Sequence, residues 1–319
     1  MSDNETSNSE TTTGDNDVRV ETFAAEGPLE IDISLIVGRV EIRLAAEGSE
    51  GGARVEVRPD ESAKPPWVDG LSGMLDWVGE RFGSQFGSQF GAPFGGGQDS
   101  GPGDALREAR VEKVGNRLVI QAAKALPLRK TPLSVLVEAP AGSHLDVRAG
   151  AADVKVTGTA GRTNLATGSG EITLERADGA TVVRTGSGAI KLGPVLSGLQ
   201  LRTGSGDVEA ASLAGSATVA TGTGDIWLGE VAGDVLVRSG SGDLAVAEAA
   251  SGSLELITGS GEVRIGIRAG VAAEVDLTSS SGTVSSELDF GDTPPEGDVP
   301  LRVRGRTGSG NAVLTAAVQ

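Results

Sequence analysis

Apolar residues in the second half of the chain recur in pairs with a fixed spacing. Leu199 and Leu201 form one pair and Val208 and Ala210 form the next, so the gaps between successive apolar positions alternate between two and seven residues. A pair separated by one residue is the inward face of a short β-strand, and the gap of seven contains a turn. Two strands with their turns occupy 18 residues, and we expect each such unit to be one coil of a stack.

A glycine motif marks one turn of every coil. The phrase TGSG or a close variant recurs, and its second glycine lies at Gly170, Gly188, Gly206, Gly224 and Gly242, 18 residues apart, and then at the wider intervals of Gly261, Gly282 and Gly310. Tight corners need a positive φ, which glycine adopts without penalty. We therefore interpret TGSG as a structural corner. A phosphate-binding loop is disfavoured because no helical period follows the motif.

A left-handed helix of three hexapeptides also has an 18-residue coil. That fold needs one apolar residue in every six, and stepping back six positions from Ile190 or Val208 reaches Arg184 or Arg202. An unpaired arginine could not lie in a narrow apolar core. The sequence therefore predicts an all-β fold, a single-stranded parallel β-helix (β-solenoid) with two short strands per coil.

The same rhythm extends upstream and divides the chain. It recurs faintly through residues 145–165 and 31–42. We expect a disordered acidic tail over residues 1–17, because this stretch is too polar to offset the entropy of ordering. The β-solenoid is predicted over residues 18–58 and 107–319, interrupted by an insert at 59–106.

The insert differs from the coils in both pattern and composition. Its apolar residues follow a helical period, followed by the low-complexity FGSQ repeats. The residues of this amphipathic stripe are Trp67, Leu71, Met74, Leu75, Val78 and Phe82. Two roles stay open for the helix: it covers the N-terminal end of the solenoid, or it docks a protein partner.

Charge and composition narrow the classes of partner. The net charge is −17, with 27 basic and 44 acidic residues, which argues against nucleic acid and anionic membranes as partners. Cysteine is absent and aromatic residues make up 3%, which suits a thin aliphatic core. We expect no transmembrane segment, since no apolar run approaches the required ~20 residues. The N-terminal segment lacks the features of a secretory signal, so a cytoplasmic location is expected.

Stacked coils align equivalent side chains into columns. Two columns carry hydroxyl groups, which we expect to hydrogen-bond along the stack; they begin at Thr167 and Ser169. A third carries carboxylates, which we interpret as a solvated acidic stripe. Ala189 interrupts it and the spacing differs from that of calcium-binding β-rolls, so no metal site is predicted.

Two features of the outward-facing positions bear on binding. Arg184, Arg202 and Arg238 are expected to point outward and to balance nearby acids. Trp227 is also expected outside, as a possible partner contact, because tryptophan is favoured in binding hot spots.

The sequence offers few side chains of the kinds that usually carry out catalysis. His144 is the only histidine, there is no cysteine, and the serines lie within corner repeats. The checklist of nucleophile, base and pocket is not met, so we predict neither an enzyme nor a cofactor.

The run from LSVLVEAPAGSHLDVRAGAADVKVTG through TGSGEITL, TGSGDVEA and TGTGDIWL to RTGSGNAVL resembles the bacterial "putative adhesin" β-strand-repeat family, also called Toastrack. The resemblance covers residues 18–58 and 107–319. It implies a β-solenoid without established catalysis and kinship with modules linked to bacterial envelope-stress systems. We expect a non-catalytic interaction scaffold with a protein partner. An exported surface adhesin and a self-assembling filament are the alternatives.

Overall fold

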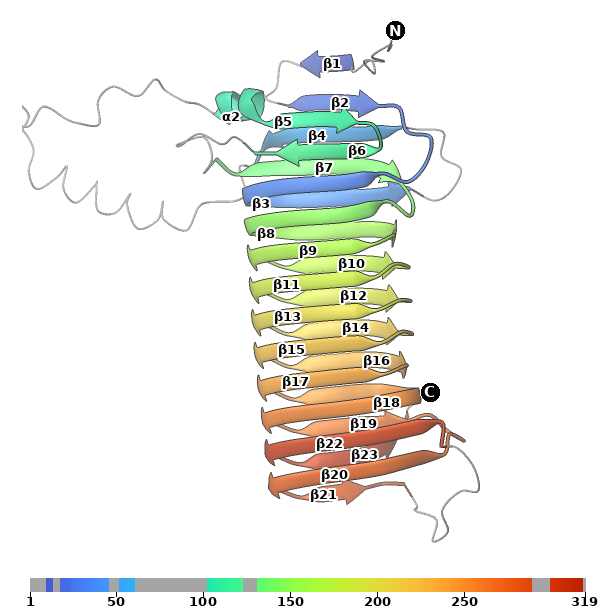
Figure 1. Ribbon diagram of the computed structural model, residues 1–319. Helices are drawn as coiled ribbons and strands as arrows, with labels where there is room; N and C mark the ends of the chain where they lie inside the picture. Colours follow the sequence, from blue (N-terminus) through green and yellow to red (C-terminus); the bar gives the residue numbers. More distant parts are fainter. Residues whose placement is uncertain are drawn as a thin grey trace, which may run out of the picture.

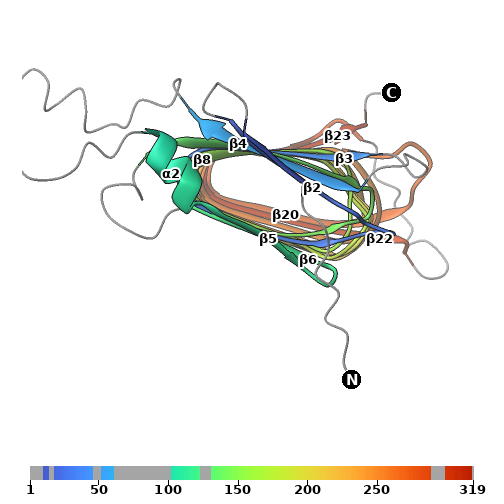
Figure 2. The same cartoon turned by 90° about the horizontal axis from the view of Figure 1, so that it is seen from above.

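The computed structural model describes residues 10–13, 18–45, 52–60, 102–122, 131–288 and 299–317. These form a straight stack of flattened coils, with the N-terminal strands at one end (Figure 1). Viewed along the stack, each coil is an elongated ring around a narrow core (Figure 2). The predicted all-β solenoid is confirmed. Among the described residues, no helix has the length and apolar character needed to cross a membrane.

Each regular coil contributes one strand to each of two facing sheets. Sheet I contains the strands that end at the TGSG corner: β9 (Thr163–Ser169), β11 (Thr181–Ser187), β13 (Leu199–Ser205), β15 (Ala217–Thr223) and β17 (Val235–Ser241). Sheet II contains the strands that follow it: β10 (Ile172–Ala177), β12 (Ile190–Val195), β14 (Val208–Leu213) and β16 (Ile226–Ala232). Neighbours within a sheet are parallel, and Ile190 pairs with Val208, one 18-residue coil further on.

The core consists of the apolar pairs that the sequence predicts. Leu201 and Val208 are buried, whereas Arg184 and Arg202 are exposed on the outside. This burial pattern confirms the two-strand coil, because the hexapeptide alternative would have placed these arginines inside.

The corner glycines have the expected backbone. Gly206 has φ of 125°, and an ideal Cβ built on it would lie 2.3 Å from the carbonyl oxygen of Gly188 in the adjacent coil. Glycine is therefore required both by the backbone conformation and by the close approach of stacked corners.

The buried hydroxyl column differs from its prediction. Thr185 Oγ1 donates to the carbonyl of Ser187 at 3.0 Å, two residues ahead in the same corner, and Thr203 bonds Ser205 in the same way at 3.1 Å. A hydroxyl facing its own corner carbonyl finds an acceptor without reaching across to the next coil. Some of these hydroxyls also reach the neighbouring coil: Thr258 Oγ1 lies 3.1 Å from Gly242 O, and Thr167 Oγ1 lies 3.3 Å from Ala152 O.

The C-terminal coils stack out of sequence order. After β18 (Leu244–Ser260) and β19 (Val263–Ile267), the chain forms β20 (Ala273–Ser281) and β21 (Val284–Ser286), and then β22 (Leu301–Ser309) and β23 (Ala312–Ala316). Strand β22 pairs with β18 on one side and β20 on the other, and β23 lies between β19 and β21. The last coil in sequence is thus the second to last in space (Figure 1).

Packing favours this order. Gly305 is an inward position of β22 without a side chain, and Leu277 of β20 fills the space: an ideal Cβ on Gly305 would lie 2.6 Å from Leu277 Cδ2. The lengthened intervals at Gly282 and Gly310 are explained by the same arrangement, because Gly310 stacks on Gly261 and Gly282 on Gly310.

The N-terminal part is only partly coiled as predicted. Strand β3 (Glu30–Ala45) runs parallel to β8 (His144–Ala160), with Ile31 opposite Leu145 and Val40 opposite Val154, which confirms the rhythm there. The remaining strands are β1 (Glu10–Thr13), β2 (Arg19–Phe23), β4 (Ala53–Pro59), β5 (Arg110–Val114), β6 (Arg117–Gln121) and β7 (Leu133–Pro140). Strands β1, β2, β4 and β7 pair antiparallel in that order, as do β5 and β6. Within the predicted solenoid segment 18–58, β2 and β4 thus pair antiparallel rather than as parallel coils, and residues 10–13 of the predicted disordered tail form β1.

The end of the predicted insert belongs to the folded body. Helix α2 (Pro102–Glu108) packs beside β4 at the N-terminal end of the stack, with Ala105 and Leu106 buried (Figures 1 and 2). Arg19 holds the end of α2 in place by donating hydrogen bonds to the carbonyls of Leu106 (3.2 Å) and Ala109. The same guanidinium forms an ion pair with the buried Glu21 at 2.5 Å. The boundaries predicted at 59 and 106 move accordingly, since β4 reaches Pro59 and α2 begins at Pro102. The predicted helix and the FGSQ repeats lie outside the described residues.

Candidate interaction surfaces

The acidic column at the TGSG corner has a structural role that its sequence pattern did not show. Asp207 Oδ1 accepts the backbone N–H of Asp225 at 2.9 Å, Asp225 Oδ1 that of Asp243 at 2.8 Å, and Asp243 Oδ1 that of Glu262 at 2.7 Å. Each carboxylate thus satisfies a backbone donor of the neighbouring coil. The column is a set of bonds between coils rather than only a solvated stripe. Within the described ranges, no group of three or more potential metal ligands converges.

His144 has a structural contact as well. It is exposed, and its Nδ1 accepts the backbone N–H of Arg162 at 3.0 Å, which joins β8 to the turn before β9. This bond leaves only Nε2 of the imidazole open to another group. Among the described residues, no Ser or Thr hydroxyl that could act as a nucleophile is hydrogen-bonded to His144.

Trp227 lies on the outer surface of sheet II, as predicted. Its residue is 44% exposed on β16, flanked in register by Glu209 and Ala245. The ring covers Gly229, whose ideal Cβ would lie 3.3 Å from Trp227 Cη2. It is thus an isolated aromatic surface. The other proposed partner contacts, Trp67, Leu71, Met74, Leu75, Val78 and Phe82, lie outside the described residues.

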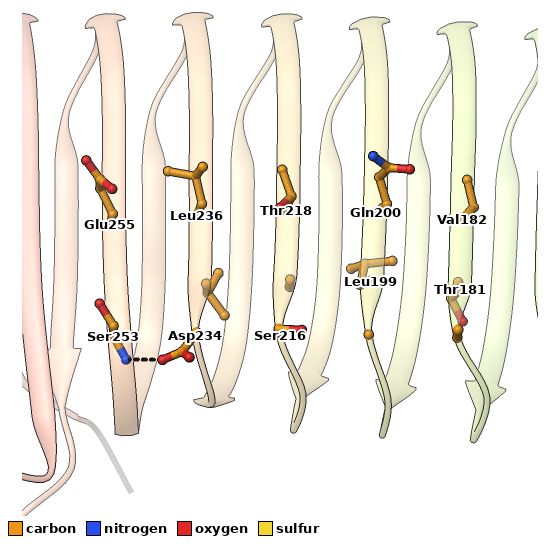
Figure 3. A pocket seen from close by; sticks show the side chains of 14 residues that line it. Thr181, Val182, Leu199, Gln200, Ser216, Thr218, Asp234, Leu236, Ser253 and Glu255 are labelled. Carbon is orange, nitrogen blue, oxygen red and sulfur yellow. Dashed lines mark hydrogen bonds between the residues drawn. The ribbon is translucent and has the colours of Figure 1, made fainter.

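A shallow groove crosses the strands of sheet I beside the turns opposite TGSG. Its volume is about 600 Å³, and its floor is the outward column Val182, Gln200, Thr218, Leu236 and Glu255 (Figure 3). Turn residues form its edge, and one of them, Asp234 Oδ1, accepts the backbone N–H of Ser253 at 3.1 Å. A second hollow of about 390 Å³, lined in part by His144 and Arg162, shares Ala180 and Val182 with the first. We call this continuous surface the axial groove, because it runs along the stack.

A column of arginines lies next to the groove floor, two residues further along the same strands. The strand register aligns one residue from each coil in this column. In order along the stack, these residues are Arg184, Arg202, Ala220, Arg238, Ile257 and Arg306. We call Arg184, Arg202, Arg238 and Arg306 the arginine row. All four are exposed, and within the part of the chain that the structure describes none forms an ion pair or a side-chain hydrogen bond.

Other arginines show the contrast. Arg268 donates to Glu230 at 2.5 Å and also to Glu248, and these bonds, the one to Glu248 above all, raise the pKa of Arg268. A bond to Asp32 at 2.5 Å likewise raises the pKa of Arg117. Among the described residues, no ion pair joins Arg184, Arg202 or Arg238 to a carboxylate, so the expectation that they balance nearby acids is wrong. The column spacing in the sequence could have located the row, but its lack of partners needed the structure.

These observations define a class: a straight β-solenoid with long outer faces, a groove and an uncompensated cationic row. The Toastrack DUF4097 family profile matches residues 119–315, and the chain belongs to this family. No curated protein is significantly similar to it.

Several solved structures match this chain over most of its length. A "putative adhesin" from Bacteroides fragilis is 13% identical, with 93% of this chain and 96% of that one covered and a TM-score of 0.34. One from Parabacteroides distasonis is 12% identical over 95% and 98%, with a TM-score of 0.30. A "putative lipid binding protein" from the same species is 10% identical over 96% of both chains, with a TM-score of 0.29. Similarity at this level carries no functional argument for this chain.

Proposed function

We propose that this protein is a non-catalytic interaction scaffold that presents its outer faces to a partner. The observation that carries the proposal is a straight surface of strands in register that presents exposed side chains without an ion pair or hydrogen bond among the described residues, namely the arginine row and Trp227. Most of the other described arginines form ion pairs, as Lys191 does with Glu171 (2.9 Å). Family membership is consistent with a role in binding rather than in catalysis.

The insert is proposed to dock a protein partner. Helix α2 already covers part of the N-terminal end, so the amphipathic stripe between Trp67 and Phe82 has less need to serve as the cover. A cytoplasmic location and a link to envelope stress remain predictions from the sequence, which cell fractionation and the stress sensitivity of a deletion strain would test.

The docking proposal is tested with a deletion of residues 61–101 bridged by a Gly/Ser linker, which spares β4 and α2. Pull-downs compare this variant with the full chain, and captured proteins are identified by mass spectrometry. We expect unchanged β-rich circular dichroism and loss of one specific partner. As a matched pair, Leu71→Ser should weaken capture and Asp76→Asn should not. Unfolding or aggregation of the deletion variant would instead make the insert a cover.

Self-association is the second candidate, and the C-terminal end favours it. Among the described strands, β20 and β21 each pair on one side only, and Val284 is 50% exposed there. Such unpaired edges can template pairing with another chain. The N-terminal end differs, with antiparallel strands and α2, so we propose pairing of two copies through their C-terminal ends rather than a filament. Light scattering of Val284→Lys against wild type tests this: a monomeric wild type would contradict it, and so would a dimer that the substitution leaves intact.

A further inference from the structure

We infer that the arginine row and the axial groove form a binding site for a linear acidic polysaccharide lying along the solenoid axis. The inference rests on the proposed scaffold function and names the surface and the class of ligand.

The arginine row is a group of positive charges on an acidic chain, without partners among the described residues. On a chain of net charge −17, the described arginines without a side-chain partner are Arg39, Arg58 and the four members of the arginine row. Arg184 lies directly opposite Arg202 in the register of β11 and β13. Like charges facing each other on adjacent strands are unfavourable. A bound anion would relieve this repulsion and gain charge-assisted hydrogen bonds to guanidinium groups.

The second argument is spacing. Neighbouring strands lie about 4.8 Å apart, so the row places cations one rung and then two rungs apart along a straight line. Pyranose rings in an extended glycan succeed one another at close to one rung, so a chain along the axis aligns one sugar with each coil. An extended peptide advances about 3.3 Å per residue and falls out of step with the coils.

The third argument is the chemistry on either side of the row. On the groove side are Gln200 and Thr218, whose side chains form no internal hydrogen bond among the described residues. On the other side are the exposed hydroxyl groups of the second column: Ser187, Ser205, Thr223 and Ser241. Amide and hydroxyl groups that flank a cation suit a ligand carrying both hydroxyl and carboxylate groups.

The fourth argument is width. Beyond the hydroxyl column lies the exposed acidic column of Asp207, Asp225 and Asp243. A bilayer surface or a nucleic acid duplex would overlap these carboxylates and be repelled. A single polysaccharide chain is narrower and can lie along the row, where Glu255 is the one acidic residue of the groove floor.

The test is binding of the full-length protein to polygalacturonate, a linear polyuronate, by isothermal titration calorimetry at low and high salt. Highly methyl-esterified pectin supplies the same backbone with its charge masked. Arg184→Gln with Arg202→Gln is compared with a matched control, Arg39→Gln with Arg58→Gln, which removes two equally unpartnered arginines from β3 and β4. Circular dichroism checks that both variants keep the wild-type fold.

We expect the wild-type protein to bind, with an affinity that falls as salt is added. The affinity of the row variant should be roughly tenfold or more lower, because the row supplies the charge-assisted bonds, and that of the control should stay within about twofold of wild type. The inference is overturned if wild type does not bind, if both variants lose affinity equally, or if esterified pectin, poly-glutamate or oligo-dT binds as well as polygalacturonate. Any of these results would leave the scaffold proposal standing as long as the 61–101 comparison shows specific partner capture.

Discussion

At the scale of single residues, two kinds of position control this molecule: corner glycines and outward charges. Gly206 combines a positive φ with a close stacking contact, and Gly115 has a positive φ (59°) but no atom within 4 Å of an added Cβ. The outward charges also differ, since Arg268 bridges two carboxylates and Arg202 faces another arginine. Each contrast separates one physical cause from another.

Substituting the corner glycine should cost far more than backbone strain alone. We expect Gly115→Ala to lower the free energy of unfolding by about 1–2 kcal/mol, the cost of a left-handed backbone for an L-residue. Gly206→Ala should lose clearly more, because its Cβ would meet a carbonyl oxygen at 2.3 Å. Urea titrations of both variants measure the difference. Equal losses would show that stacking contributes nothing.

Removing outward arginines should shift the thermal midpoint in opposite directions. Arg202→Gln relieves repulsion with Arg184, so we expect a rise of about a degree or two. Arg268→Gln leaves Glu230 facing Glu248 in register without their shared cation, so we expect a fall. Differential scanning calorimetry in low salt checks both, and a fall for Arg202→Gln would mean that the row is internally compensated.

At the scale of elements, the sequence predicted what depends on local pattern. Alternation at Leu199 and Leu201 and the glycine at 206 determine strand and corner, and both were confirmed. Strand direction was not predictable, because β2 and β4 alternate with the same period of two whether they pair parallel or antiparallel. The order of the last coils depends on Leu277 filling the space at Gly305, a contact between residues 28 apart that no repeat rule encodes.

The order of the C-terminal coils can be tested with engineered cysteines in this cysteine-free chain. Arg264 pairs with Val313, one rung away, whereas Ser285 lies a further rung beyond. Disulfides require Cα atoms about 4.4–6.8 Å apart. We expect Arg264→Cys with Val313→Cys to crosslink and Arg264→Cys with Ser285→Cys to remain reduced. Stacking in sequence order would give the reverse result on a non-reducing gel.

Calcium should not stabilise the protein through the acidic corner column. Asp207, Asp225 and Asp243 already accept backbone N–H groups through Oδ1, so one oxygen of each carboxylate joins the coils. We therefore expect no gain in melting temperature with millimolar calcium. A chelator-reversible rise would require a metal site instead.

At the scale of the whole molecule, the coils form a straight stack whose two ends differ from each other, as do its two faces. The N-terminal end carries α2 and antiparallel strands, and at the C-terminal end no other described strand pairs with the outer edges of β20 and β21 (Figure 1). Sheet I carries the groove and the arginine row, and sheet II carries Trp227. The sequence located Arg184, Arg202, Arg238 and Trp227 on the outside, but it could not show that the arginines lack carboxylate partners, because that depends on which residues the stacking makes neighbours.

The most direct test of a ligand-binding face on sheet I is to locate where a polyanion touches the molecule. Arginine-labelled protein is titrated with polygalacturonate while the Nε–Hε signals are followed by NMR, with assignments from single Arg→Gln variants. We predict that the signals of Arg184, Arg202 and Arg238 shift together, and that those of Arg176 and Arg264 on sheet II, held by Asp178 (2.8 Å) and Glu262 (2.7 Å), remain in place. Shifts spread over all exposed arginines, or confined to sheet II, would contradict a ligand-binding face on sheet I.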